Sequence, residues 1–470
     1  MRGGFRPHFF RRDTTDGTDD PLLWRSRGAP VLRCAGCAAV ASMGDPWPWS
    51  CPQRREGDDI DHVIVPQLDL GGVPLVMSDS ANPFIRYRGR LSSYHLWVGG
   101  GRDDQSFVAL VESLDAAVAR VAGHGFRITP LGHFPDIDEA VGARVWVKDE
   151  TGNVAGSHKG RHLFGVLLLL RVLESLGHDV GGELVIASCG NAALAAATLA
   201  AAGGRHLTAF VPAGADPGVM ALLAAAGAGV EVCPRDGRPG DPCYRRFRQA
   251  VAAGAIPFSC QGPDNGFAIE GAATIAWEVA EARAGVLDRA VIQVGGGALA
   301  AACVQGLSVL AALPVIDTVQ TTGAHPLERA VGRLRARAGT GAGVSGAGAT
   351  GTGAVDEALA DAARHRSRYM WPWETEPASV ATGILDDETY DWLVVARAML
   401  ATGGAPVVVG EAALEEANRL ARSATGIDVN ETGSAGLAGL LALARAGRVA
   451  PGSDVLVLFT GRRRPATRLS

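Results

Sequence analysis

Lysine is nearly absent from this sequence. The chain has 44 lysine and arginine residues, and only Lys148 and Lys159 among them are lysines. A guanidinium stays protonated and cannot act as an amine nucleophile, so the two lysines are candidates for chemistry that arginine cannot perform. The bias alone leaves a second interpretation open, in which a lysine is kept for its apolar stem or by chance.

Long apolar runs and an excess of positive charge are absent as well. The longest apolar runs, such as Val166–Leu170, are far shorter than the roughly 20 residues that span a bilayer. Residues 1–20 contain no apolar signal segment. The net charge of −5 provides no basic surface for nucleic acid, and eight cysteines in 470 residues are too sparse for a disulfide framework. We therefore expect a cytoplasmic protein that binds neither membranes nor nucleic acid.

Length and apolar content predict two domains. A chain of 470 residues exceeds one ordinary domain, and its 47% hydrophobic residues can bury a sizeable core. From about residue 62 onward, short apolar runs alternate with helical patterns rich in Ala and Leu, which predicts an α/β fold with a parallel sheet. The predicted strands are Val145–Val147, Glu183–Ala187, Leu207–Val211, Val230–Cys233, Val291–Val294 and Val455–Phe459. The predicted helices are His158–Leu176, Ala192–Ala202, Val219–Ala226, Gly271–Ala284, Ala298–Leu313 and Ser434–Ala446.

Two segments do not follow this alternation. Residues 1–60 are rich in Arg, Asp, Pro and Trp, and they contain Cys34, Cys37 and Cys51. The stretch Ala338–Ala354 consists almost entirely of small residues. Because it offers few bulky side chains for packing, we predict a flexible insertion there.

The segment around Lys159 has the pattern of a strand, a glycine-containing loop and the start of a helix. Ser157 is suited to the N-cap, so Lys159 is predicted to lie in the first helical turn. A cation there opposes the helix dipole, and His158, Arg161 and His162 add positive or potentially positive charge. Both features favour the neutral amine that attacks an aldehyde. The alternative is a solvated surface lysine, the commoner case for a lysine taken alone.

Two further turns are typical of anion binding. Ser188–Asn191 lies between a predicted strand and a helix, where backbone N–H groups can bind a carboxylate or a phosphate. Gly295–Gly297 follows another strand and leaves the backbone open to a phosphate. It matches neither the dinucleotide fingerprint nor the Walker loop. Each turn also has a purely structural interpretation, as a helix cap or as tight strand-to-helix packing.

Thr460 ends the last predicted strand. The carboxyl edge of an open α/β sheet is where ligands usually bind, so its hydroxyl is a candidate ligand contact. A plain strand-end turn explains it equally well.

The order of these four features resembles that of the fold-type-II pyridoxal-phosphate enzymes, the tryptophan-synthase-β superfamily. The resemblance extends from Thr129 to Gly461 and includes the step Glu270–Gly271 into a long helix. It implies two three-layer α/β domains with mostly parallel sheets and pyridoxal phosphate in the cleft between them. The implied division is an extension (1–60), a large cofactor-binding domain (61–182 and 263–470) and a small substrate-gating domain (183–262).

The resemblance also implies roles for individual residues. Lys159 would hold the cofactor as a Schiff base and act as general base, Asn191 would contact the phenolic oxygen, and Thr460 the pyridine nitrogen. The implied phosphate loop is Gly295, Gly296, Gly297, Ala298 and Leu299. The implied site for the substrate carboxylate is Ser188, Gly190, Asn191 and Ala192. The expected partners are a small amino-acid substrate and further copies of the chain in a homo-oligomer.

The cysteine-bearing start resembles the zinc knuckle of some threonine synthases. Cys34, Cys37 and Cys51 would supply three ligands, but Arg54 stands where a fourth cysteine is expected. A structural zinc site needs four ligands, and a cation cannot replace a thiolate. His62 is a candidate for the fourth position. The alternative is a degenerate extension with free thiols.

The resemblance leaves several reactions open. His158 precedes the lysine, as in the tryptophan-synthase-β branch, while Ile427–Gly436 resembles a motif of threonine synthases and serine/threonine ammonia-lyases. A neutral hydroxyl at Thr460 favours elimination or replacement over transamination. Because no second phosphate pocket is identified for a phosphorylated homoserine, we expect a lyase of the threonine/serine ammonia-lyase type. Threonine synthase is the alternative, and a non-catalytic ligand-binding homologue is the third possibility.

Overall fold

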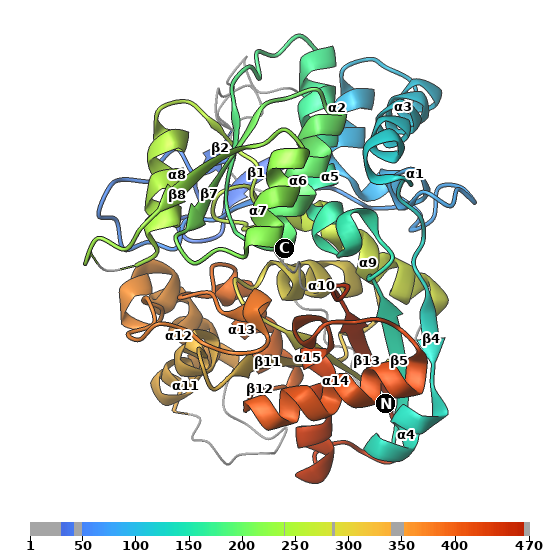
Figure 1. The fold of residues 1–470 in the computed structure, drawn as a ribbon, viewed down its shortest axis with the longest axis vertical. Coiled ribbons are helices and arrows are strands. Elements are labelled where there is room, and N and C mark those ends of the chain that lie inside the picture. Colours follow the sequence, from blue (N-terminus) through green and yellow to red (C-terminus); the bar gives the residue numbers. More distant parts are fainter. Residues whose placement is uncertain (1–29, 42–48, 239, 284–286, 340–351, 465–470) are drawn as a thin grey trace.

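The computed structural model describes residues 30–41, 49–238, 240–283, 287–339 and 352–464. Within them the chain forms two α/β halves and a small N-terminal sheet (Figure 1). The predicted insertion at Ala338–Ala354 lies outside the described residues over 340–351. None of the described helices is long and apolar enough to cross a membrane.

The lower half in Figure 1 is built on a six-stranded sheet. Its strand order is β12 (Pro406–Val409), β11 (Val315–Thr321), β10 (Arg289–Gln293), β13 (Asp454–Phe459), β5 (Arg144–Asp149) and β4 (Leu131–His133). All neighbours are parallel except β4 and β5, which are antiparallel. Every residue of β13 is buried, as a central strand covered on both faces requires.

The upper half contains a four-stranded, fully parallel sheet. Its order is β8 (Gly229–Cys233), β7 (Leu207–Pro212), β6 (Leu184–Ala187) and β9 (Ile256–Pro257). A separate antiparallel sheet near the N-terminus has the order β2 (Val40–Ala41), β1 (Val31–Cys34) and β3 (Ile64–Gln67). The predicted α/β class with mostly parallel sheets is therefore confirmed.

Fifteen α-helices lie in the described residues and surround the sheets. They are α1 (Pro83–Arg86), α2 (Ser92–Gly99), α3 (Asp104–Ala122), α4 (Pro135–Val141), α5 (Lys159–Ser175), α6 (Asn191–Ala202), α7 (Pro217–Ala225), α8 (Pro242–Ala252), α9 (Phe267–Ala282), α10 (Ala298–Leu307), α11 (Pro326–Arg337), α12 (Thr352–Arg364), α13 (Trp392–Thr402), α14 (Glu411–Thr425) and α15 (Glu431–Arg445). Short 3₁₀ turns are η1 (Arg88–Arg90), η2 (Val154–Gly156), η3 (Arg366–Arg368) and η4 (Thr382–Ile384). Each strand and helix predicted from the pattern is present, and most ends are shifted by no more than four residues. Helix α10 ends at Leu307, six residues before the predicted end, and the predicted helix end at Ala284 lies outside the described residues. The predicted boundary at residue 183 separates α5 from α6, although these two helices pack together.

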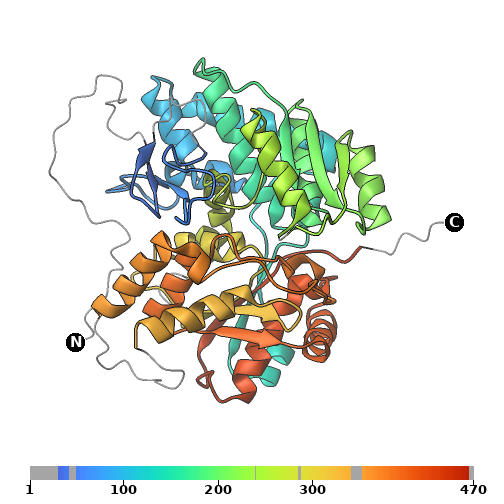
Figure 2. The same cartoon turned by 90° about the vertical axis from the view of Figure 1, so that its left-hand side faces the viewer.

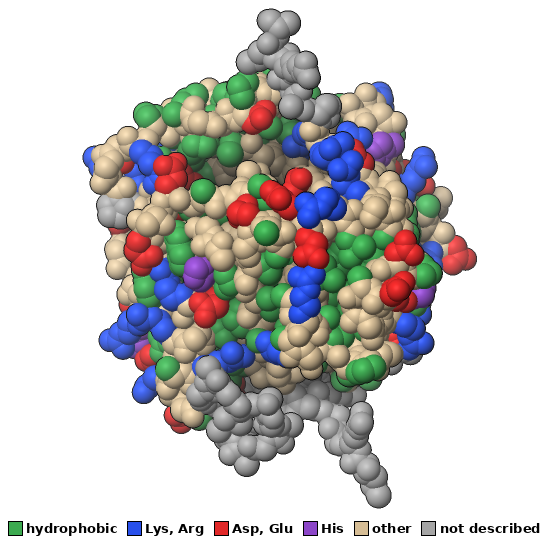
Figure 3. All heavy atoms as spheres, turned by 60° about the horizontal axis from the view of Figure 1, so that its bottom comes forward, with side chains coloured by type: hydrophobic (Ala, Val, Ile, Leu, Met, Phe, Trp, Pro, Cys, Tyr) green, Lys and Arg blue, Asp and Glu red, His purple; other side chains and the backbone are tan. Residues whose placement is uncertain are grey.

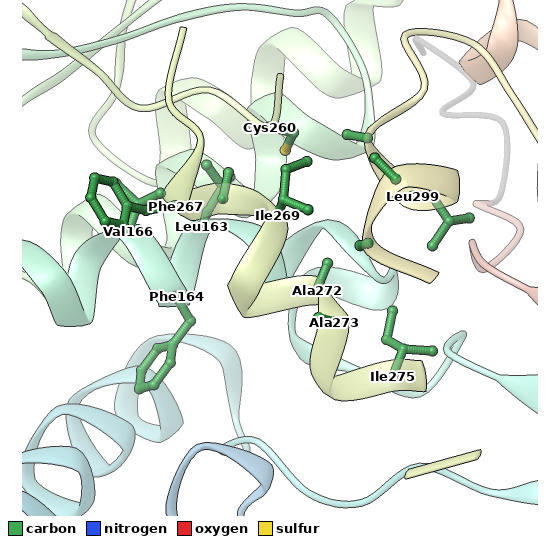
Figure 4. Packing of buried hydrophobic residues seen from close by; sticks show 14 of the residues in the cluster. Leu163, Phe164, Val166, Cys260, Phe267, Ile269, Ala272, Ala273, Ile275 and Leu299 are labelled. Carbon is green, nitrogen blue, oxygen red and sulfur yellow. The ribbon is translucent and has the colours of Figure 1, made fainter. Parts of the chain in front are cut away.

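Helices α5, α9 and α10 form the packed centre between the halves (Figure 4). Phe164 and Ile275 are both fully buried there. The crossing of α5 and α9 is close because glycines face each other: a Cβ added at Gly271 would lie 3.1 Å from the Cα of Gly165 and 2.3 Å from the backbone oxygen of Arg161. This contact gives the step Glu270–Gly271 a packing role.

The surface carries charges of both signs. On the face drawn in Figure 3, basic and acidic side chains are interspersed rather than gathered into one patch. This distribution agrees with the small net charge of −5.

Candidate active site

Lys159 is the first residue of α5, directly after the segment that follows β5. The segment before Lys159 has an unusual backbone. Ala155 in η2 has a left-handed conformation (φ 58°), which residues with a side chain rarely adopt. Ser157 forms an isolated bridge with Gly461, which brings the end of β13 beside Lys159. The predicted N-cap is wrong: His158 holds that position without a side-chain cap, and the Ser157 hydroxyl is buried with no protein partner in the described chain.

The side chains next to Lys159 do not crowd it with positive charge as the sequence predicted. His158 is buried, and burial together with the charge of Lys159 lowers its pKa to about 3. Burial likewise lowers the pKa of His162 well below its ordinary value. Arg161 pairs with Glu150 (2.9 Å) and with Glu278. The two imidazoles are therefore neutral, and the guanidinium is compensated.

One ring nitrogen of His158 is hydrogen-bonded, and the other has no protein partner among the described residues. Its Nδ1 donates to the backbone oxygen of Thr460 (3.2 Å), which can only accept. The Nε2 atom is buried without a protein partner among the described residues. This places an unused acceptor next to Lys159.

The Thr460 hydroxyl lies at the end of β13 and is held by Gln293 from β10. The amide nitrogen of Gln293 donates to Thr460 Oγ1 (2.9 Å) and to the backbone oxygens of Gly433 (2.9 Å) and Leu458 (3.1 Å). Because the hydroxyl accepts this bond, its own hydrogen is available for a different acceptor. Gln293 belongs to the same motif as the glycine triplet, yet its contact with Thr460 spans 167 residues.

The glycine triplet Gly295–Gly297 joins β10 to α10, as predicted. Gly297 has φ 93°, a conformation that favours glycine, and no side chain caps the start of α10. A Cβ added at Gly295 would lie 2.3 Å from a carboxylate oxygen of Asp386. The backbone N–H of Gly296 lowers the pKa of the same carboxyl group, against the effect of burial. An acidic side chain thus lies against the amides that the sequence predicted for phosphate.

Two carboxyl groups near the triplet were missed by the sequence argument. Burial raises the pKa of Asp386 to about 6 and that of Asp391 to about 8. Asp391 accepts the N–H of Gly262 (3.1 Å), and its own backbone N–H donates to the oxygen of Gly296 (2.9 Å). Both carboxyl groups are within electrostatic reach of Lys159. The run of acidic residues at 386–388 is a sequence signal, but nothing local connects it to a triplet ninety residues earlier.

The turn from β6 to α6 faces the site with backbone N–H groups. Gly190 occupies the N-cap of α6 without a side-chain cap, and the Ser188 hydroxyl accepts a long bond from the Gly190 N–H (3.4 Å). The Oδ1 atom of Asn191 is buried without a protein partner in the described residues. Its amide nitrogen approaches Gly461, where an added Cβ would lie 2.9 Å away. Asn191, Thr460 and Lys159 therefore come from three elements that meet at one place.

Lys148 has a structural environment. It is almost fully buried, donates to the backbone oxygen of Thr129 (2.6 Å) and pairs with Glu278. The same Glu278 pairs with Arg161, so the four charges of Lys148, Glu278, Arg161 and Glu150 form one compensated network. Of the two lysines in the chain, only Lys159 lies at the candidate site.

The predicted zinc cysteines also come together. Cys34, Cys37 and Cys51 lie around His62, with all four potential ligand atoms within 4.8 Å of one another. Arg54 is turned away and donates to the backbone oxygen of Pro263 (3.1 Å).

Comparisons with known proteins point to one family. The sequence model of the family described as "Pyridoxal-phosphate dependent enzyme" matches residues 123–461, more than half of the chain. Among solved structures, maize serine racemase has a TM-score of 0.56 at 18% identity, covering 76% of this chain and 96% of that one. The threonine deaminase of T.th. has a TM-score of 0.54 at 21% identity, with 76% and 98% covered. L-serine ammonia-lyase from the fungus Rhizomucor miehei has a TM-score of 0.52 at 18% identity, with 72% and 94% covered. At these identities the similarity shows a shared fold.

Proposed function

This chain belongs to the family of pyridoxal-phosphate-dependent enzymes, and we propose that it is a lyase that removes the β-hydroxyl of a small amino acid such as serine or threonine. The observation that carries the choice of reaction is the Thr460 hydroxyl, which is neutral and oriented by Gln293 (2.9 Å). Racemisation and replacement at the same site are distinguished from elimination by their products.

The residues at the site fit the cofactor that the family implies. Lys159 offers the amine, Asn191 and Thr460 offer polar side-chain atoms, and the start of α10 offers amides that no side chain caps. Several buried atoms there have no protein partner in the described residues, among them Ser157 Oγ, His158 Nε2 and Asn191 Oδ1. Unpartnered buried polar atoms are costly unless a ligand or water satisfies them. The Asp386 carboxylate beside Gly295 and Gly296 supports the assignment of these amides to an anion.

Pyridoxal phosphate, when bound, supplies an electron sink for the charge that develops at the substrate α-carbon. The chain supplies the base: Lys159 Nζ takes the α-proton and holds it near the departing β-hydroxyl. His158 is neutral, so it does not compete with Lys159 as a proton donor at neutral pH. A neutral hydroxyl does not stabilise a positive charge on the pyridine nitrogen that Thr460 would contact. Thr460 would therefore favour prompt loss of the β-substituent over transamination.

The turn between β6 and α6 is proposed to bind the substrate carboxylate. The N–H groups of Asn191 and Ala192 lie at the start of a twelve-residue helix that no side chain caps, where the helix dipole favours an anion. The Ser188 hydroxyl, beside Gly190, adds a donor. These groups would position a substrate carboxylate near Lys159.

The activities named for similar solved structures support this proposal without deciding the reaction. Two of them are a threonine deaminase and an L-serine ammonia-lyase, and another is a serine racemase. All three act on small amino acids by name. Elimination, racemisation and replacement must therefore be separated by their products.

The test is incubation of the purified, cofactor-loaded protein with L-serine, L-threonine and O-phosphohomoserine. We expect ammonia and a keto acid from serine or threonine, and no turnover by Lys159→Ala, which also loses the visible absorbance of the bound cofactor. Phosphate release with formation of threonine would instead establish a threonine synthase. D-serine without ammonia would establish a racemase. A wild-type protein that stays colourless after loading would identify a non-catalytic homologue.

A further inference from the structure

We propose that Cys34, Cys37, Cys51 and His62 form a structural zinc site that fastens the N-terminal sheet to the rest of the molecule. The four residues are contributed by the β1 hairpin and by the loop between β2 and β3. The proposal does not depend on which reaction the enzyme catalyses.

Two of the separations between the ligand atoms match those around a tetrahedral zinc ion, and all four atoms lie within 4.8 Å of one another. Zinc bonds of 2.0–2.3 Å place tetrahedral ligand atoms roughly 3.3–3.8 Å apart. Cys34 Sγ lies 3.3 Å from His62 Nδ1, and Cys37 Sγ lies 3.6 Å from Cys51 Sγ. Three thiolates and one imidazole form a closed set of soft ligands, which is typical of structural rather than catalytic zinc.

His62 is held in the orientation that a metal ligand requires. Its Nε2 donates to the carboxylate of Asp58 (2.8 Å), and Asp58 in turn accepts the backbone N–H of Ile60 (2.9 Å). A proton on Nε2 leaves the lone pair of Nδ1 facing the three sulfurs. Such a carboxylate partner is the usual second support of a metal-binding histidine.

The turns around the cysteines are also suited to thiolates. Ala38 follows Cys37 in a left-handed conformation (φ 62°), and the turn is closed by the bond from the Cys34 N–H to the Ala39 oxygen (2.8 Å). The backbone N–H of Gln53 donates to Cys51 Sγ (3.4 Å). No space remains at Gly36, where an added Cβ would lie 2.3 Å from the Asp61 oxygen. The hairpin and the loop are therefore pressed together at the cluster.

The loop that carries His62 connects two distant parts of the chain. The Asp61 N–H donates to the Ala363 oxygen (2.8 Å), and the Asp59 oxygen accepts from the Arg366 N–H (2.8 Å), at the end of α12. Arg54, three residues after Cys51, donates to the oxygen of Pro263 just before α9 (3.1 Å). Figure 2 shows the small sheet in dark blue beside both the upper half and the orange helices. A metal that orders this loop would thus stabilise the contact between the halves.

The first measurement is the metal content of the purified full-length protein. We expect one zinc per chain, released stoichiometrically when a mercurial reagent blocks the thiols. Less than a tenth of an equivalent after growth with added zinc, or stoichiometric iron in place of zinc, would overturn the proposal.

Variants then assign the metal to these residues. Cys37→Ser and His62→Gln should lose the zinc, whereas Cys233→Ser, a cysteine of strand β8 outside the cluster, should keep it. Asp58→Asn should keep the fold and weaken zinc affinity by about 10- to 100-fold. Should Cys37→Ser be insoluble, exchange of zinc for Co²⁺ in the wild type provides the same test, since thiolate-bound tetrahedral cobalt has a characteristic visible spectrum. Full zinc content in His62→Gln, or a cobalt spectrum without thiolate bands, would contradict the assignment.

Discussion

Replacing Asp386 by asparagine should remove a pH-dependent obstacle to cofactor binding. The carboxylate lies against Gly295 and near Gly296, whose amides we assign to the cofactor phosphate. Two anions cannot share these amides without repulsion, so the cofactor must bind while Asp386 is protonated or displaced. Asp386→Asn keeps the shape of the side chain and removes its charge.

The size of the effect follows from the pKa of Asp386. Burial raises the pKa of this carboxyl group from 3.8 to about 6, a difference that corresponds to about 3 kcal/mol. Because the pKa is higher in the folded than in the unfolded protein, the unfolded chain loses this proton first. Wild-type stability should therefore decline by about 3 kcal/mol as pH rises from about 4 to above 6. Asp386→Asn should lack this part of the decline.

The assay is a titration of the cofactor-free protein with pyridoxal phosphate between pH 5 and pH 8, with urea unfolding in parallel. The ratio of the wild-type Kd to the Asp386→Asn Kd cancels the titration of the cofactor itself. It should rise above pH 6 by up to about tenfold per pH unit. Asp387→Asn, at the neighbouring residue, is the matched control. Its Kd for pyridoxal phosphate should stay close to the wild-type Kd at each pH. A ratio that does not change with pH, or an equal effect of Asp387→Asn, would refute the reasoning.

Three further substitutions test the packing and the role of the second lysine. Gly271→Ala should destabilise the protein by about 1–3 kcal/mol, because its Cβ would meet the Arg161 backbone oxygen at 2.3 Å. The control is Gly332→Ala, on an open surface of α11. In urea unfolding it should instead stabilise the protein by up to about 1 kcal/mol. Lys148→Met should lower the free energy of unfolding by about 3 kcal/mol, since it removes one partner of the buried Glu278. The folded variant should nevertheless keep the visible absorbance of the cofactor. Loss of that band with unchanged stability would show that Lys148 contacts the cofactor.

Much of the architecture could be predicted from local patterns. Apolar runs such as Val455–Phe459 and helical stretches such as Ala192–Ala202 are decided by neighbouring residues, because alternation and periodicity act over a few positions. The predicted family and the α/β class are confirmed. Strand β11 was missed because Asp317 interrupts its apolar pattern; in the fold, Asp317 is buried against Arg289 and accepts the N–H of Ala405 (2.8 Å).

The surroundings of Lys159 could be predicted only in part. Its place at a helix start was evident from the loop before it, but the charge around it was not. Arg161 looked like a neighbour that would raise the local positive charge, and its partner Glu278 is 117 residues further along the chain. His158 and His162 are neutral because they are buried, and burial is a property of the packed fold.

Asp386 and His62 are two further residues whose surroundings could not be predicted from the neighbouring sequence. By itself, the sequence determined that a scarce lysine, a glycine triplet and a terminal hydroxyl follow one another in the order of a known family. It also placed three cysteines near one end. Only the tertiary structure decided that Asp386 meets the triplet and that His62, rather than Arg54, faces the cysteines. The reason is physical: secondary structure depends on residues a few positions apart, whereas charge, protonation and ligand sets depend on side chains that only folding brings within a few ångströms.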